Sequence, residues 1–263
     1  MHTDYHVHTC YSDDSECPME EMVQQAISLG LDEIAFTEHV DYGVKTDLNC
    51  RYQEYFKELQ ELQEKYKGRL AIKKGIEFGV QKETIPQYRE DFSKYDFDFV
   101  ILSNHQIHNQ EFWNQCFQKG KSQEEFQRAY YDAILDVVKN YKEYSVLGHL
   151  DMIKRYDKYG NYSDENIMDM VELIFHYVIS EGKGIEVNTS CFRYGLEDLT
   201  PSRAILGMYY EMGGRILTLG SDAHAPRDLG CHMEEAQREL RKIGFTQFCT
   251  FEKMQPMFHS LRR

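Results

Sequence analysis

The feature that most constrains the fold of this chain is a sevenfold alternation of strand-like and helix-like segments. Short apolar runs are each followed by a longer segment whose apolar residues recur at helical spacing. This alternation predicts a mainly parallel sheet, and the single hand of the crossovers makes a closed barrel the economical arrangement. The expected strands are 3–8, 33–37, 70–76, 98–102, 145–149, 184–188 and 216–220, and the expected helices are 19–27, 52–66, 83–94, 123–141, 164–180, 200–212 and 233–243.

Composition narrows the class of protein further. The 263 residues, 41% of them hydrophobic, suffice for the core of one α/β barrel, so we expect a single domain over residues 1–263. No run of 18 apolar residues and no signal-like N-terminus exist, and the seven cysteines form no Cys-x-x-Cys, which favours a soluble cytoplasmic protein without a membrane partner. The net charge of −14 argues against nucleic acid. The oligomeric state is left open.

Candidate metal ligands begin with His6-Val7-His8 in the first expected strand. Successive side chains of a strand point to opposite faces, so the two imidazoles project together and can share one cation. Further candidates follow at the ends of later expected strands: His39, Glu77, His105, His149, Asp222 and His224. In a barrel these ends meet on the face where active sites form. Independent surface residues would not sort in this way, so we predict a metal centre.

The chemistry of the candidates is mixed imidazole and carboxylate, without thiolate. Such a set favours zinc, iron or manganese over a structural cysteine site. The number of candidates exceeds the needs of one ion, which predicts two or three ions that share a bridging carboxylate and catalyse hydrolysis. The nine candidates are His6, His8, Asp13, His39, Glu77, His105, His149, Asp222 and His224.

The same residues resemble the polymerase and histidinol phosphatase (PHP) family, in the order in which that family has them and through nearly the whole chain. The resemblance is carried by His6-Val-His8, Ser12-Asp13, Thr37-Glu38-His39, Gly75-Ile-Glu77, Ser103-Asn-His105, Gly148-His149 and Ser221-Asp222-Ala-His224. Two segments, 148–156 and 186–193, are similar to the histidinol-phosphate phosphatase branch of the family.

The resemblance implies a distorted (β/α)7 barrel with three divalent metal ions. One ion would bind His6, His8, Glu77 and Asp222; the second would share Glu77 and add His105 and His149; the third would bind Asp13, His39 and His224. Asp13 and Asp14 are adjacent, and either residue could be the third-site ligand. We expect Asp13.

The implied reaction is hydrolysis of L-histidinol phosphate, a small-molecule phosphate ester of histidine biosynthesis, by a metal-bridging hydroxide that attacks phosphorus. Arg155 and Arg193 would grip the phosphate oxygens, because guanidinium forks bind them bidentately. Glu111 and Tyr156 are candidates to contact the amino and imidazole groups of the substrate. Glu77 would be essential as the shared ligand, and Asp222 or His224 would assist the departing alkoxide.

Two other functions compete with this one. The first is a PHP-family hydrolase of another phosphate ester, either a phosphatase or a nuclease; acidity and the lack of a basic groove disfavour a nuclease. The second is a regulatory module that binds metal without turnover. The complete ligand set and both arginines argue against that module.

Overall fold

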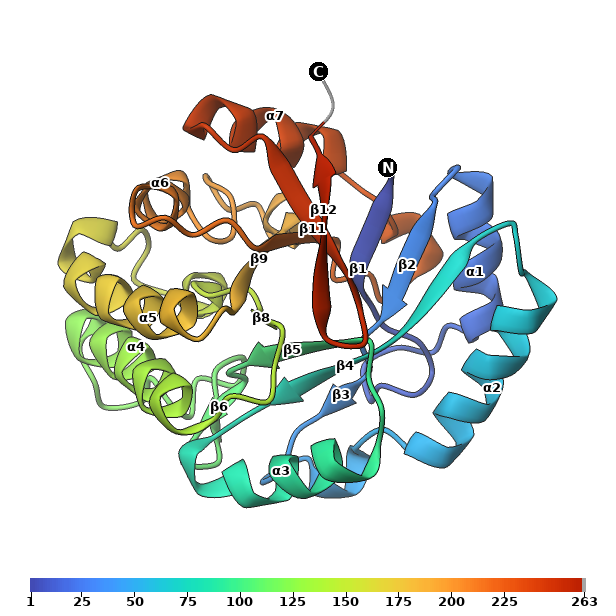
Figure 1. Cartoon of the computed structure of the whole chain (residues 1–263). Coiled ribbons are helices and arrows are strands. Elements are labelled where there is room, and N and C mark those ends of the chain that lie inside the picture. The colour runs from blue at the N-terminus through green and yellow to red at the C-terminus, as the bar shows by residue number, and fades with distance from the viewer. Residues whose placement is uncertain (262–263) are drawn as a thin grey trace.

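The strands of the computed structural model, which describes residues 1–261, form a nearly closed parallel barrel surrounded by helices (Figure 1). Neighbouring strands along the order β1-β2-β4-β5-β8-β9-β10 are parallel. The barrel closes where the His8 amide donates to the Ala223 carbonyl at 2.9 Å. The prediction of a distorted (β/α)7 barrel is confirmed. The strands are β1 (Thr3–Val7), β2 (Glu33–Phe36), β4 (Ala71–Gly79), β5 (Phe99–Ser103), β8 (Val146–Leu147), β9 (Gly184–Asn188) and β10 (Leu217–Gly220).

Helices cover the outside of the barrel, as the sequence spacing predicts. Each helix turns an apolar stripe toward the strands, because a helix in a two-layer fold must bury one face. Ser122 caps the longest helix, accepting from the Glu125 amide at 3.3 Å. Within residues 1–261, no helix is both long and apolar enough to cross a membrane. The helices are α1 (Met19–Ser28), α2 (Tyr52–Lys65), α3 (Ile85–Lys94), α4 (Gln123–Asn140), α5 (Met168–Ser180), α6 (Arg203–Glu211) and α7 (Met233–Ile243).

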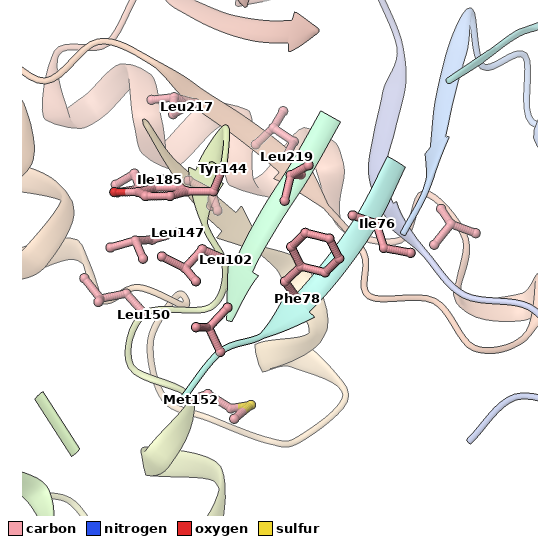
Figure 2. Packing of buried hydrophobic residues seen from close by; sticks show 14 of the residues in the cluster. Ile76, Phe78, Leu102, Tyr144, Leu147, Leu150, Met152, Ile185, Leu217 and Leu219 are labelled. Atoms are coloured by element: carbon pink, nitrogen blue, oxygen red, sulfur yellow. The ribbon is translucent and has the colours of Figure 1, made fainter. Parts of the chain in front are cut away.

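Alternation along the strands divides the apolar side chains between two clusters. Ile76 and Phe78 of β4 and Leu102 of β5 belong to the larger cluster, which lies between the strands and the helices (Figure 2). Phe99 and Ile101 of β5 belong to a smaller cluster with apolar side chains of β1, β2 and β8. Glu77 stands between Ile76 and Phe78, so its carboxylate points to the opposite face of β4, toward the inside of the barrel.

A C-terminal hairpin closes the barrel at the end where the strands begin. It consists of β11 (Gln247–Glu252) and β12 (Gln255–Ser260), red in Figure 1. Cys249 and Phe251 of β11 join the smaller cluster, and the Phe251 amide donates to the Tyr5 hydroxyl at 2.8 Å. The strands and helices expected from the sequence end at residue 243, so this hairpin was not predicted; residues 262–263 lie outside the described residues.

Three details near the opposite end also differ from the sequence prediction. Strand β4 continues to Gly79, so Glu77 lies within a strand rather than after one. The second strand is interrupted, and its continuation β3 (His39–Val40) pairs with β4 so that His39 is opposite Glu77. The stretch between the expected strand 98–102 and the expected helix 123–141 contains a small hairpin of β6 (Gln106–Ile107) and β7 (Gln110–Glu111). Predicted ligands lie at both elements, since His39 is in β3 and His105 directly precedes β6.

Candidate metal centre

Eight of the nine predicted ligands come together at the carboxyl end of the barrel strands. They reach this place from six different strands or the segments that follow them, because the ends of parallel strands meet on one face. The residues are His6 and His8 at β1, His39 at β3, Glu77 in β4, His105 after β5, His149 after β8, and Asp222 and His224 after β10. Asp13 is the exception.

The first group joins the two histidines of β1 to two carboxylates. The Nε2 atoms of His6 and His8 lie 3.2 Å and 3.5 Å from Oε2 of Glu77. The same two nitrogens lie 3.7 Å and 3.6 Å from Oδ1 of Asp222. His6 and His8 therefore project together, and four potential ligand atoms enclose one position.

The second group uses the other oxygen of the Glu77 carboxylate. The Nε2 atoms of His105 and His149 lie 3.2 Å and 2.9 Å from Oε1. The oxygen that faces His6 and His8, Oε2 of Glu77, also lies 3.0 Å from Nδ1 of His39. Each oxygen of Glu77 thus faces its own set of imidazoles, which is the arrangement of a bridging carboxylate.

The third group contains His39, His224 and Asp14, and it corrects the choice of Asp13. Oδ1 of Asp14 lies 3.2 Å from Nε2 of His224, and its Oδ2 lies 3.6 Å from Nε2 of His39. Asp13 turns the other way and pairs with Lys45, Oδ2 to Nζ 2.7 Å. Adjacent residues in this turn point in different directions, and only Asp14 reaches the histidines.

The donor atoms of these groups fit divalent cations. Within the described residues, buried atoms without a hydrogen-bond partner include Nε2 of His6, His8 and His224, Nδ1 of His39 and Oε2 of Glu77. Unsatisfied buried polar atoms are rare and costly in proteins. Several of them converging on one carboxylate are explained by cations that accept their lone pairs, and the absence of thiolate suits zinc, iron or manganese.

The electrostatics of the centre keep its middle carboxylate ionised. Burial would raise the pKa of Glu77, but His6 and His105 overcome it and hold that pKa well below the usual value. Burial disfavours the charged form of His6, yet the carboxylates of Glu186, Glu77 and Asp222 raise its pKa well above the usual value. An ionised Glu77 is the form that binds a cation.

Residues behind the ligands orient them, and the sequence analysis did not identify these residues as part of the site. Glu186 Oε1 lies 2.5 Å from Nδ1 of His6, and its Oε2 accepts from the His149 amide at 2.8 Å. Asp41 Oδ1 lies 2.9 Å from Nδ1 of His105. A partner on one ring nitrogen fixes the tautomer that presents the other nitrogen to a metal. The signal for Glu186 was its place in the segment 186–193.

Two glycines make room for the side chains that pack inside the barrel beside the ligands. A Cβ atom at Gly220 would collide with the Glu186 carboxylate and lie 2.5 Å from Cβ of His6. A Cβ atom at Gly148 would lie 2.5 Å from the Ser103 hydroxyl and close to Glu186. A side chain at Gly220 would therefore displace the carboxylate that orients His6, and one at Gly148 would displace Ser103, whose hydroxyl donates to Glu77.

A pocket of about 290 Å³ opens onto the three groups, and Arg155 is part of its wall. The Arg155 side chain is only 3% exposed; its Nη1 lies 3.2 Å from Oδ2 of Asp222, and the ring of Tyr194 lies over the guanidinium at 4.6 Å. The Nε atom has no hydrogen-bond partner among residues 1–261. The pocket is lined by Asp14, His39, Asp41, Lys45, His105, Trp113, His149, Met152, Arg155, Tyr156, Tyr194, Asp222 and His224.

The other predicted substrate residues divide between the pocket and its surroundings. Tyr156 lines the pocket, whereas Arg193 and Glu111 do not line it. The two terminal nitrogens of Arg193 donate to the carbonyls of Ser221 and Asp222 at 2.7 Å and 2.6 Å. Glu111 instead accepts from Asn114 at 2.6 Å. Of the two predicted phosphate-gripping arginines, this geometry brings only Arg155 to the pocket.

Comparison with known proteins identifies the family of this chain and several proteins of similar sequence. A family described as "PHP domain" matches residues 4–190. The histidinol-phosphatase of Lactococcus lactis is 35% identical over 258 residues, which cover 95% of this chain and 94% of that protein. A probable histidinol-phosphatase of Thermotoga maritima is 29% identical over 249 residues, covering 92% of each chain.

Among solved structures, this chain is similar to a crystal structure of the histidinol phosphate phosphatase of Lactococcus lactis. That structure is a complex with zinc, L-histidinol and phosphate. The two folds superimpose with a TM-score of 0.89 at 33% sequence identity, and the match covers 97% of this chain and 98% of the other. The likeness therefore extends over the barrel and over the segments that carry the three groups.

Proposed function

This chain belongs to the PHP domain family, and from that membership we propose that it is a metal-dependent phosphatase that hydrolyses L-histidinol phosphate to L-histidinol and phosphate. The observation that carries the proposal is the Glu77 carboxylate, whose two oxygens face five imidazoles, three of which line a pocket together with Arg155. The substrate follows from the relatives, because the Lactococcus structure holds both products of this reaction.

The ligand assignment that we propose places three divalent ions around Glu77. Its support is the set of buried nitrogen and oxygen atoms that lack protein partners in the described residues. Zinc is supported by its presence in the Lactococcus relative, and iron or manganese would suit the same donors. The first ion would bind His6, His8, Glu77 and Asp222; the second Glu77, His105 and His149; and the third His39, His224 and Asp14.

In the mechanism, Arg155 binds the phosphate oxygens and holds phosphorus over the centre. Its contacts with Asp222, Asn188 and Ser190 and its low exposure hold the guanidinium in place, so little reorganisation accompanies charge growth on the equatorial oxygens. Divalent ions in the three groups would polarise the phosphate and activate water for attack. Asp222 and His224 both line the pocket, and either side chain would hold the proton that the departing alkoxide receives. Tyr156 would contact the organic part of the substrate.

The experiment that tests the proposal compares kcat/KM for three substrates on protein of assayed metal content. These are L-histidinol phosphate, p-nitrophenyl phosphate and bis(p-nitrophenyl) phosphate. We expect L-histidinol phosphate to exceed the other two by several orders of magnitude. Faster hydrolysis of the diester would contradict the monoesterase assignment. Equally slow hydrolysis of all three would exclude L-histidinol phosphate as the substrate, but it would not contradict the assignment of a metal centre.

Two broader parts of the proposal concern the whole chain. We propose that residues 1–263 form one catalytic domain, because the core contains elements from β1 to α7. We also propose a cytoplasmic location, which the free thiols of all seven cysteines support.

A further inference from the structure

Lys45 is a second basic side chain in the wall of the pocket. Among the residues of its lining, Lys45 and Arg155 are the lysine and arginine side chains. Arg193, the other basic residue expected near phosphate, donates to two backbone carbonyls instead. The lining otherwise includes the carboxylates of Asp14, Asp41 and Asp222. An anionic substrate therefore meets positive protein charge at Arg155 and Lys45.

Contacts from two other loops hold Lys45 at this place. Its Nζ lies 2.7 Å from Oδ2 of Asp13, which comes from the segment after β1. The same Nζ lies 4.7 Å from the ring centroid of Trp113, which follows β7 and also lines the pocket. The side chains of Lys45 and Asp13 are only 20% and 15% exposed. Lys45 is therefore not a freely moving surface lysine.

The contacts of Lys45 leave part of its binding capacity unused. A lysine ammonium has three N–H donors, and Asp13 is the acceptor that the described residues offer it. The face of Trp113 attracts the charge without accepting a directed hydrogen bond of ordinary strength. Two donors remain for oxygens in the pocket, and an ammonium binds phosphate well as a point charge.

We propose that Lys45 is a phosphate-binding residue of this site and that Asp13 and Trp113 position it. This inference rests on the proposed function only in taking a phosphate ester as the substrate. It also assigns a task to Asp13, which does not reach the histidines of the third group. The two adjacent acids would then have different roles: Asp14 would bind metal, and Asp13 would position the phosphate-binding Lys45.

The test measures binding of inorganic phosphate to the metal-loaded protein by calorimetry, together with KM and kcat for L-histidinol phosphate. For K45M we expect the phosphate Kd and the KM to rise about tenfold or more, as for loss of a charge-assisted hydrogen bond, with metal content and Tm unchanged. K45R should retain phosphate binding, because it keeps the charge. D13N should weaken phosphate binding less than K45M does. K82M is the matched control, since Lys82 pairs with Asp136 at 2.9 Å outside the pocket.

The outcomes separate this inference from the proposed substrate. An unchanged phosphate Kd in K45M overturns the role of Lys45, and so does an equal rise in K82M. If K45M proves unstable, a K45R protein that folds but no longer binds phosphate also overturns it. If the wild-type protein fails to hydrolyse L-histidinol phosphate while its phosphate binding still depends on Lys45, the substrate is wrong and the inference about Lys45 stands.

Discussion

Nδ1 of His6 lies 2.5 Å from Oε1 of Glu186, so a buried carboxylate on β9 orients a histidine on β1. The contact fixes which nitrogen of His6 faces Glu77. For E186Q we therefore expect the affinity for metal in this group to fall about 10–100-fold, as is typical when the partner of a metal-binding histidine is lost. Competition with a chromophoric chelator measures the change.

The control for this prediction is E172Q, because Glu172 is exposed on α5. That variant should keep wild-type metal affinity. Wild-type affinity in E186Q as well would show that the carboxylate has no part in orienting His6.

Much of the site could be predicted because the ends of short apolar runs in the sequence indicate where the strands end. His39, His105 and His149 each follow or open a short apolar run, and parallel strands bring their ends to one face. Glu186 was not predicted as a site residue because it lies inside β9, where a polar residue gives no periodic signal. Its partner is 180 positions away in the chain, and only the closed barrel brings the two together.

The choice between Asp13 and Asp14 shows a different limit. The two residues are adjacent in a turn, and the direction of each side chain depends on local backbone angles rather than on any repeating pattern. The C-terminal hairpin was missed for a third reason. Cys249 and Phe251 pack with Tyr5 at the end of the barrel where the strands begin. The hairpin therefore depends on tertiary packing rather than on its own sequence.

The variants D14N and D13N should separate the roles of the adjacent acids. D14N removes a charged oxygen from the group with His39 and His224, so we expect the protein to retain fewer metal ions and to lose kcat by at least about a hundredfold. D13N should retain the wild-type metal content, because Asp13 contacts Lys45 instead. Elemental analysis after gel filtration measures both. The reverse pattern would restore Asp13 as the ligand.

Loss of Arg155 should impair the reaction far more than loss of Arg193. Arg155 is buried in the pocket wall, whereas Arg193 is not part of the pocket lining and binds two carbonyls. We expect R155K to lower kcat/KM for L-histidinol phosphate about 10–100-fold, because lysine cannot reproduce the planar fork. R193K should lower it less. A larger loss in R193K would mean that Arg193 leaves its carbonyls to bind substrate.

Removing metal should destabilise the fold. The metal-free centre leaves buried nitrogens and Oε2 of Glu77 without partners in the described residues, and binding to the native state adds stability in proportion to the logarithm of ligand concentration. At a thousand times Kd the gain is about 4 kcal/mol per site. We expect Tm to fall by several degrees on chelation and to recover as zinc or manganese is titrated back. A Tm indifferent to metal would contradict a centre built into the barrel.

The substitution E77Q should have the largest effect of any single change in the centre. Oε2 of Glu77 faces His6, His8 and His39, while Oε1 faces His105 and His149. An amide offers one oxygen and no charge, so one of the two groups that share this residue loses its ligand and the other keeps only a neutral oxygen. We expect kcat to fall by orders of magnitude and the metal content to fall by more than one ion per chain. E83Q, an exposed change shortly after the same strand, is the control. Near-wild-type turnover with full metal content in E77Q would rule out the shared carboxylate and leave two independent sites.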